Sequence, residues 1–477
     1  MKVRKRLATG RRMRRGFTSV MAMLYLVLFS ALSLGFYTAT TMSVQISKNE
    51  RSMSVAQIGA ESGLRYMRYQ MGLINVTVAS GGDLLTPVYT ALQSSMSGTQ
   101  NLGSDSIAMS GGVIYIPSSN TSHFITSDAT TGAKFRIEIS QVGTQIVLKS
   151  YGQGTSSTIT RGIQLCFSQA AHASAIFNYG VASKGKITTA GASYIVGAPD
   201  PTKGSVLSTD AVDSTPIIVD GKQVSGDISI TNPTGTVSYS GASIGGTSDP
   251  AQIPNHIHIG VPAPLFPTVD PSPYINAATA SSYGLLPGLT KQAAGSGTYA
   301  GYYVNCTIPP NTNPSFSGTV KIAGVLYIKA PNVVSFKGDT TVQGVIIVEP
   351  AATNDPVHNQ INFTGSVAAK STSTLDSTFG TLPSLTGAFI LAPGFATNFS
   401  GDFGTIGGSI ISSQVSMTGN AGGTIQGSVI CLDNNPMLVN GSADIIIAST
   451  GTSQYPSGVN FGAYYRPLPD TYAELVP

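Results

Sequence analysis

Residues 316–328, FSGTVKIAGVLYI, match in pattern residues 336–348, FKGDTTVQGVIIV. Each segment has a Phe, a Gly two positions later, a second Gly six positions after the first, and then an apolar run. The two copies are offset by 20 residues. A period near 20 with short strands and Gly corners predicts a right-handed parallel β-helix, in which stacked coils bury one another's apolar side chains.

The same pattern recurs on both sides of these two segments. The second of these copies can be extended back to Val334, and further copies begin at Ile187, Val237, Phe399 and Val415, with fainter ones around Phe363 and Val439. Glycine at a corner permits a positive φ, and the Asp339, Asp402 and Asn420 that follow corner glycines suit such turns. We interpret these three as turn residues, because the dense repetition of calcium-binding coils is lacking. The competing fold is an antiparallel β-sandwich, whose strands recur about every 8–12 residues.

These observations assign residues 173–450 to the β-helix, with one interruption. Residues 247–305 form a Pro-rich insertion with seven prolines between Pro250 and Pro273. Pro cannot donate to a strand ladder, so we expect a loop or strap on the surface of the coil. Residues 451–477 lose the pattern and are expected to cap the last coil or trail from it.

Residues 73–172 have the pattern of short antiparallel strands. Residues 113–116, 135–139, 145–149 and 159–167 are the candidate strands, and Gly-rich turns separate the later ones. In residues 135–139 apolar and charged side chains alternate, as in a strand with one buried face. The prediction for this region is a short antiparallel meander.

The N-terminal region predicts a membrane anchor. Eight of the 26 basic residues lie in the first fifteen positions, and residues 17–47 carry no charge. About 20 predominantly apolar residues suffice to cross a bilayer as a helix, so we assign 17–42 to a transmembrane helix. Because positive flanks stay cytoplasmic, Arg11, Arg12, Arg14 and Arg15 are expected to determine the topology, with the body exported.

An amphipathic helix is predicted to extend this span over residues 43–72. Its apolar stripe recurs at helical spacing. The stripe consists of Ile46, Met53, Ala56, Ala60, Leu64, Met67 and Met71. Such a stripe suits docking of a globular head. Mainly β structure behind one long N-terminal transmembrane and amphipathic helix is therefore the predicted fold class.

The junction RRGFTSV at residues 14–20 resembles the cleavage site of type IV prepilins. Together with the AESGL element at residues 60–64, it is similar to the N-terminal segment of PilX-like minor pilins and pseudopilins, over about residues 11–72. The resemblance implies that 1–16 is a leader, that a prepilin peptidase cuts after Gly16, and that Phe17 is then methylated. Most major pilins have Glu five residues into the mature chain, where this chain has Met21.

The resemblance also implies partners and a location. A pilin-like region at 73–172 would carry the β-helix as head of a minor or tip subunit, with other pilin-like subunits and the membrane as partners. A surface polysaccharide or another cell would be the ligand of an adhesive head. The expected location is the cytoplasmic membrane, single-pass, with the body in the periplasm or on the cell surface or filament. The alternatives are a permanently anchored surface adhesin without a filament role, a cleaved secretory signal, and, least favoured, a β-helix polysaccharide lyase or hydrolase.

Chemical motifs are sparse in this sequence. His256 and His258 would point to one side of a strand and form half a zinc site, but neither Asp249 nor Asp270 has convincing ligand spacing. We therefore interpret the histidines as a surface polar pair and predict neither metal nor cofactor. Asp433-Asn434-Asn435, the densest polar cluster, is interpreted as a loop. No nucleophile elbow, phosphate loop or dinucleotide fingerprint occurs, so we predict a protein that is not an enzyme.

The cysteines argue against a disulfide-stabilised scaffold, and the overall charge argues against a nucleic-acid-binding protein. Cys166, Cys306 and Cys431 are too few and too scattered for a disulfide framework. We expect buried free thiols, with one bridge plus one free thiol as the alternative. Beyond residue 15 the chain carries 18 basic and 22 acidic residues, so its basic character belongs to the leader and no affinity for nucleic acid is indicated.

Overall fold

A computed structural model of the chain describes residues 14–76, 83–154, 158–171, 174–289, 301–350, 355–448 and 455–475, with side chains from residue 17 onward. The chain divides into two compact units. Unit 1 comprises Met1–Ala171 and Ala463–Pro477, and unit 2 comprises His172–Gly462. Unit 2 is therefore inserted in sequence between two parts of unit 1. The first thirteen residues, with most of the predicted leader and Arg11 and Arg12, lie outside the described residues.

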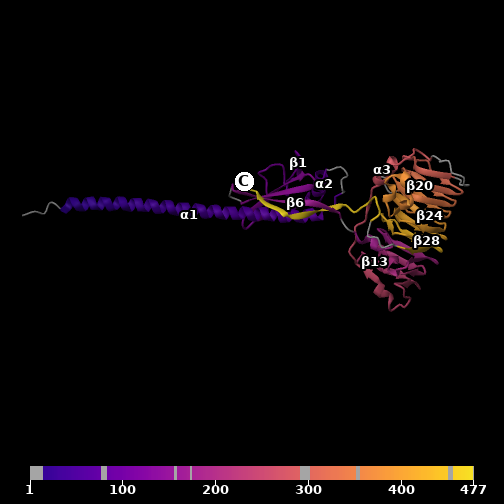
Figure 1. The fold of residues 1–477 in the computed structure, drawn as a ribbon. Coiled ribbons are helices and arrows are strands. Elements are labelled where there is room, and N and C mark those ends of the chain that lie inside the picture. The colour runs from indigo at the N-terminus through magenta and orange to yellow at the C-terminus, as the bar shows by residue number, and fades with distance from the viewer. Residues whose placement is uncertain are drawn as a thin grey trace, which may run out of the picture. The chain divides into compact units, whose positions relative to one another are not determined.

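One helix, α1 (Arg14–Leu73), covers both predicted helical segments without a break (Figure 1). It contains a window of mean hydropathy 2.0 that is not buried anywhere within the protein. Among the described residues it is the one helix that is long and apolar enough to cross a membrane. The predicted helices over 17–42 and 43–72 are thus two parts of one rod.

The remainder of unit 1 is an antiparallel sheet with a second helix. Its strands are β1 (Ala108–Ser110), β2 (Val113–Ile116), β3 (Ile125–Asp128), β4 (Ala133–Val142), β5 (Gln145–Gln153), β6 (Thr160–Ala171) and β33 (Ala463–Leu475), in the order β1-β2-β4-β5-β6-β33 with β3 beside β4. The predicted antiparallel meander is confirmed as β4-β5-β6. Helix α2 (Leu85–Met96) was not predicted, although it buries Leu85, Val88, Leu92 and Met96 at helical spacing.

The prediction for the C-terminal residues is wrong in one respect. Residues 463–475 neither cap the coil nor trail from it, because β33 returns to unit 1 and pairs antiparallel with β6. Val76 adds a bridge to Ala463, so the end of α1 and the start of β33 are joined as well. Unit 1 is therefore completed only by the last residues of the chain.

Unit 2 contains a 24-stranded sheet whose ladder pairings are parallel, wound into stacked rungs that we call the solenoid (Figure 1). Its first run comprises β7 (Val181–Ser183), β8 (Ile187–Ala190), β9 (Tyr194–Gly197), β10 (Val206–Ser208), β11 (Ile217–Asp220), β12 (Gln223–Val224), β13 (Ile228–Ile230), β14 (Val237–Tyr239), β15 (Ser243–Ile244) and β16 (Ile257–Ile259). The predicted parallel coil is confirmed and the antiparallel sandwich is wrong. The handedness stays a prediction.

A second run completes the solenoid. It comprises β18 (Gly301–Ile308), β19 (Ser315–Phe316), β20 (Val320–Ile328), β21 (Asn332–Phe336), β22 (Thr340–Val348), β23 (Asn359–Phe363), β24 (Val367–Lys370), β25 (Ala388–Phe399), β26 (Phe403–Ile406), β27 (Ser409–Met417), β28 (Gly422–Ile425), β29 (Val429–Cys431), β30 (Met437–Val439) and β31 (Asp444–Ile447). The last rung, β29–β31, pairs in parallel with the first, β7–β9. We call this contact the seam. The chain therefore enters and leaves the stack in its middle.

The predicted Pro-rich loop over 247–305 is wrong in part, because it contains regular elements. The short helix η3 (Ile253–His256) leads into β16, which pairs with β13 at one end of the solenoid. Strand β17 (Thr268–Val269) pairs with β32 (Val459–Asn460), and helix α3 (Ser272–Ala280) buries Tyr274. The segment then reaches β18 at the opposite end. This segment is long because it connects the two runs, whose adjoining strands β16 and β18 lie at opposite ends of the stack.

The interior of the solenoid consists of columns of like residues. Phe316, Phe336, Phe363 and Phe399 stack on successive rungs with ring centroids 4.8–4.9 Å apart, which is the spacing of neighbouring strands. Glycine is required at the corners for two different reasons. Gly318 has the predicted positive φ of 75°. Gly338 does not, but a Cβ there would collide with the carbonyl oxygen of Gly318 on the next rung.

Candidate functional site

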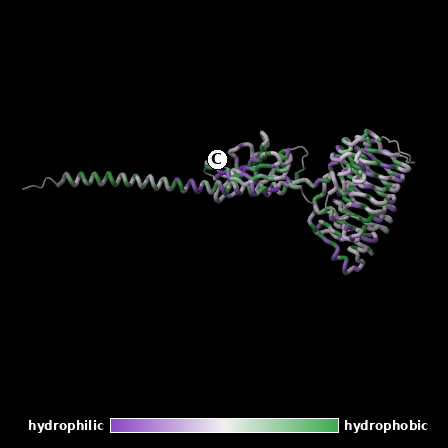
Figure 2. Tube along the Cα trace, in the orientation of Figure 1, coloured by the Kyte–Doolittle hydropathy of each residue, from purple (hydrophilic) through white to green (hydrophobic). Residues whose placement is uncertain are grey.

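The first half of α1 is an exposed apolar surface. Large side chains such as Phe17, Leu26 and Phe29 are 70–73% exposed, and Figure 2 shows hydrophobic residues recurring along this part of the helix. Its hydroxyls bond within the helix: Ser30 Oγ donates to the Leu26 carbonyl at 2.7 Å, and Thr41 Oγ1 donates to that of Tyr37 at 2.7 Å. Such bonds satisfy polar groups that would find no water inside a bilayer.

The second half of α1 packs on the sheet of unit 1 through small residues. Ala56 and Ala60 are fully buried, and so are Met67 and Met71 further along the predicted stripe. The stripe begins to pack only after its first member, since Ile46 is 53% exposed. Its burial confirms that this half of the helix docks on its own globular unit.

Glycines set how closely the helix approaches the sheet. A Cβ on Gly59 would lie 2.5 Å from the carbonyl oxygen of Lys134 in β4, and one on Gly152 in β5 would collide with the backbone of α1. The buried Ser150 Oγ also donates to the Ala60 carbonyl at 2.7 Å. This joint explains the AESGL element physically, because Ala60 and Gly63 are its members that face the sheet.

The residues of the predicted processing junction lie at the start of α1. Arg14, Arg15 and Gly16 belong to its first turn, and Phe17 is 71% exposed. The structure does not test cleavage, methylation or topology, so these stay predictions. It does show that a cut after Gly16 would leave the apolar half of the helix and the joint intact.

The histidine pair has a third member that sequence spacing did not reveal. Asp227 Oδ1 lies 2.8 Å from His256 Nδ1, and Asp227 Oδ2 lies 3.1 Å from His258 Nε2. Asp227 precedes β13, the strand with which β16 pairs, so parallel stacking brings it beside residues thirty positions later. The predicted neighbours Asp249 and Asp270 instead accept bonds from the backbone of their own turns. Both carboxylate oxygens are used by the imidazoles, an arrangement that clamps β16.

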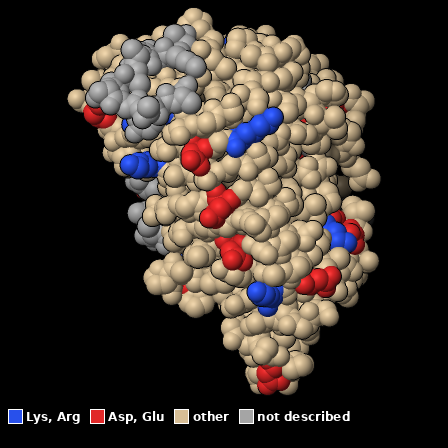
Figure 3. Space-filling model, turned by 90° about the vertical axis from the view of Figure 1, so that its right-hand side faces the viewer, with Lys and Arg blue, Asp and Glu red and all other residues tan. Residues whose placement is uncertain are grey.

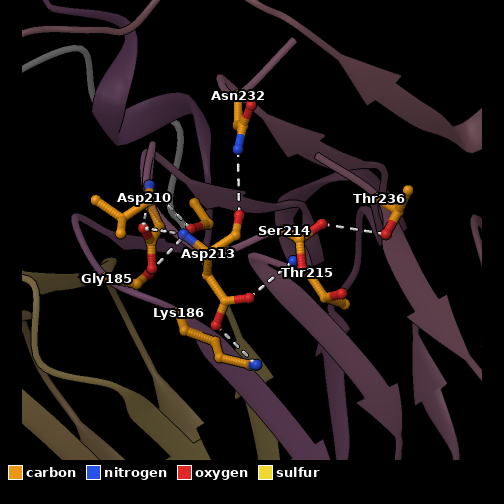
Figure 4. A network of polar contacts seen from close by, with 10 residues as sticks. Gly185, Lys186, Asp210, Asp213, Ser214, Thr215, Asn232 and Thr236 are labelled. Carbon is orange, nitrogen blue, oxygen red and sulfur yellow. Dashed lines mark hydrogen bonds and ion pairs between the residues drawn. The ribbon is translucent and has the colours of Figure 1, made fainter. Parts of the chain in front are cut away.

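A denser polar network surrounds the loop between β10 and β11 (Figure 4). Lys186 Nζ lies 2.9 Å from Asp213 Oδ2, and Asp213 Oδ1 accepts from the Thr215 amide at 2.8 Å. The bond from Thr215, helped by Lys186, lowers the pKa of Asp213 below its ordinary value. Asn232 Nδ2 donates to the Asp213 carbonyl at 3.1 Å. Since these groups bond to one another, the network fixes a loop between rungs.

The remaining candidates form no reactive centre in the part of the chain that the structure describes. Its His, Cys, Asp and Glu residues include no group of three placed to hold a metal ion. Cys166, Cys306 and Cys431 are buried free thiols, as predicted, and no bridge joins them. Asp433, Asn434 and Asn435 lie in the loop between β29 and β30. That the protein is not an enzyme stays a prediction.

The charge of unit 2 bears on its partners. Residues 172–462 contain nine lysines, no arginine and fourteen acidic residues, a formal net charge of −5. Figure 3 shows charged side chains thinly scattered over an otherwise uncharged surface. Proteins that bind polyanions neutralise them with clustered Lys and Arg, so this composition disfavours nucleic acid as a ligand of unit 2.

Comparison with known proteins gives weak structural likeness and no match in sequence. No protein-family model matches the chain, and no curated protein matches it. The crystal structure of the competence-associated pilin ComZ from Thermus thermophilus aligns with 89% of this chain and 97% of its own length, at 14% identity and a TM-score of 0.21. A TM-score of this size does not establish a shared fold.

Proposed function

We propose that the chain is a structural, non-enzymatic pilin-like subunit, a minor or tip pilin or a pseudopilin of the PilX-like kind. Helix α1 is the observation that carries this proposal: one continuous rod has an exposed apolar half and a half docked on an antiparallel sheet. The apolar half would lie in the cytoplasmic membrane before assembly and pack against related helices afterwards. The solenoid would be the exported head, for assembly or adhesion.

The direction of insertion follows from charge. The positive leader would stay in the cytoplasm and the uncharged span would cross the bilayer, so both units would lie outside. A prepilin peptidase acting at the cytoplasmic face would then reach the Gly16–Phe17 bond. The mature chain would begin with the apolar half of α1 and keep both folded units.

Mass spectrometry of the mature N-terminus tests the proposal. The full chain is expressed with a prepilin peptidase, and the expected N-terminal residue is methylated Phe17. Gly16→Leu is expected to leave the leader attached. Gly35→Leu is the matched control, because a side chain at Gly35 meets nothing within 4 Å, and it is expected to be processed normally.

Other outcomes would support the alternatives. An intact Met1 in the membrane fraction would favour a permanently anchored adhesin, and a start beyond residue 39 would favour a cleaved secretory signal. Release of reducing ends or unsaturated products from acidic polysaccharides would contradict the non-enzymatic part of the proposal.

A further inference from the structure

Five neighbouring strands of the solenoid present an outer surface without charge. Strands β21, β23, β25, β27 and β30 contain no Asp, Glu, Lys or Arg. In β21, β23 and residues 413–417 of β27, half-buried side chains alternate with fully buried ones, so they point away from the core. In β25 the outward side chain near the end of the strand is Asn398, and in β30 it is Leu438, which is 40% exposed. We call the outward side chains of these strands the amide face, because Asn, Gln and Ser predominate.

The amide face repeats one position on successive rungs. Ser335 pairs with Asn362, Asn362 with Asn398, and Asn398 with Ser416. These residues stand in one column at the strand spacing of about 4.8 Å. The column therefore offers two hydroxyls and two amides, all uncharged, at a constant interval, and it ends at Leu438 on β30.

Hydrogen bonds between the amides fix their orientation. Asn398 Nδ2 donates to Asn362 Oδ1 at 2.8 Å, and Asn362 Nδ2 donates to Gln360 Oε1 at 3.1 Å. Gln360 Nε2 donates in turn to the Pro356 carbonyl at 2.7 Å. A side-chain amide has two N–H donors and two acceptor lone pairs, so Asn398 and Asn362 each use one donor in these bonds, whereas Gln360 Nε2 also lies 3.5 Å from the Val357 carbonyl. Groups held in this way lose little entropy when they bind.

The buried amide of Asn332 differs from the amides of the outer face. Asn332 is fully buried, and its Nδ2 donates to the carbonyls of both Pro309 and Lys329 at 2.7 and 2.6 Å. Its two N–H donors are thus used within the fold. Asn362 and Asn398 are half-buried, and each donates one side-chain hydrogen bond within the fold.

We propose that the amide face binds an extended, uncharged polysaccharide. A polyanion would have to be desolvated there without a cation to pair with its charges, which is unfavourable. An extended peptide would need a free strand edge, whereas these five strands are paired on both sides. The repeated hydroxyls of a neutral glycan match a charge-free row of fixed donors and acceptors. The proposal names a ligand class for the adhesive head. It rests on one part of the proposed function, the export of the solenoid.

Retention on insoluble glycans tests this inference. Detergent-solubilised full chain is incubated with cellulose, chitin, mannan and, as acidic counterpart, cross-linked polygalacturonate. Retention is expected on at least one neutral glycan and not on polygalacturonate. Ser416→Lys places an ammonium group on the amide face and is expected to weaken retention at least tenfold. Thr341→Lys, on the outward side of β22, is the matched control and is expected to retain like the wild type.

Circular dichroism and thermal unfolding are measured to check that both variants are folded. Failure of the wild type to bind any of the three neutral glycans would overturn the inference, and so would stronger binding to polygalacturonate. Equal weakening by Ser416→Lys and Thr341→Lys would show that the amide face is not the site. Processing at Gly16 is read out separately, so either result leaves the pilin-like proposal to its own test.

Discussion

Val181, in the first strand of the solenoid, pairs in parallel with Val429, in the first strand of its last rung. Met437 with Ile187 and Asp444 with Tyr194 continue the contact along the other two strands. Each run of rungs would expose an apolar end here if the other run were absent. The two runs therefore stabilise each other at the seam, and the inserted unit is closed only after residue 447 has been added.

The seam contains a buried hydroxyl without a partner. Thr189 lies in the inward column between Val439 and Val219, and its Oγ1 is the one buried side-chain oxygen or nitrogen among the described residues that makes no hydrogen bond. A buried unpaired polar group costs about 1–3 kcal/mol. Thr189→Val is therefore expected to raise the free energy of unfolding of unit 2 by about 1 kcal/mol, measured by denaturant unfolding followed by circular dichroism.

Thr188→Val is the control for this prediction. Thr188 is the preceding residue in β8 and points outward, so its replacement is expected to change the free energy of unfolding by less than about 0.5 kcal/mol. An equal gain from both variants would mean that β propensity, and not the unpaired hydroxyl, is responsible.

The rungs themselves were predictable from sequence, because each copy carries its own signal. Phe316 and Phe336 recur at the period that brings them together on neighbouring rungs, and the stripe from Met53 to Met71 recurs at the helical period. In both cases a local pattern determines which face is buried. Such patterns are visible in one sequence without any knowledge of the partner segment.

The order of the rungs was not predictable. Nothing near Val429 distinguishes Val181 as its partner from the equivalent residue of any other rung. The return of β33 to β6 and the approach of Asp227 to His256 likewise join segments far apart in the chain. Helix α2 was missed for another reason, since its stripe is short and lies within a region of strands.

The helix–sheet joint of unit 1 predicts a steric penalty. A methyl group on Gly59 would lie 2.5 Å from the Lys134 carbonyl oxygen, which belongs to a paired strand and cannot easily move. Gly59→Ala is therefore expected to lower the free energy of unfolding of unit 1 by about 1–3 kcal/mol, although Ala favours helix. Gly72→Ala, where nothing lies within 4 Å, is expected to be neutral or slightly stabilising. Equal effects of the two changes in denaturant unfolding would argue against the close approach.

The buried thiols predict a chemical reactivity that depends on folding. Burial raises the pKa of Cys431 to about 12, and Cys166 and Cys306 are buried as well. At pH 8 the native protein is expected to show no rapidly reacting thiol toward an aromatic disulfide reagent, and three after denaturation without reductant. Two fewer thiols in the denatured protein would reveal a disulfide.

The clamp of Asp227 predicts how the terminal strand β16 responds to acid. Partial burial acts to raise the pKa of Asp227, but the hydrogen bonds from His256 and His258 outweigh it and leave the pKa below the ordinary value of 3.8. A carboxylate with a lowered pKa stabilises the folded state above that ordinary value, and its contribution is lost as the pH falls through the folded-state pKa. Protection of the β16 amides from hydrogen exchange, corrected for the intrinsic rate, is therefore expected to fall below about pH 4.

Asp227→Asn separates this clamp from general acid unfolding. The variant is expected to show weak β16 protection already at neutral pH, with little further loss on acidification, because the charged partner of both imidazoles is gone. Asp249→Asn is the matched control, since Asp249 accepts its bond from the Ala251 amide of its own turn, and it is expected to keep the wild-type profile at β16. If Asp227→Asn kept that profile too, the stability of β16 would come from its ladder with β13 alone, and the two histidines would have no part in holding the end of the solenoid.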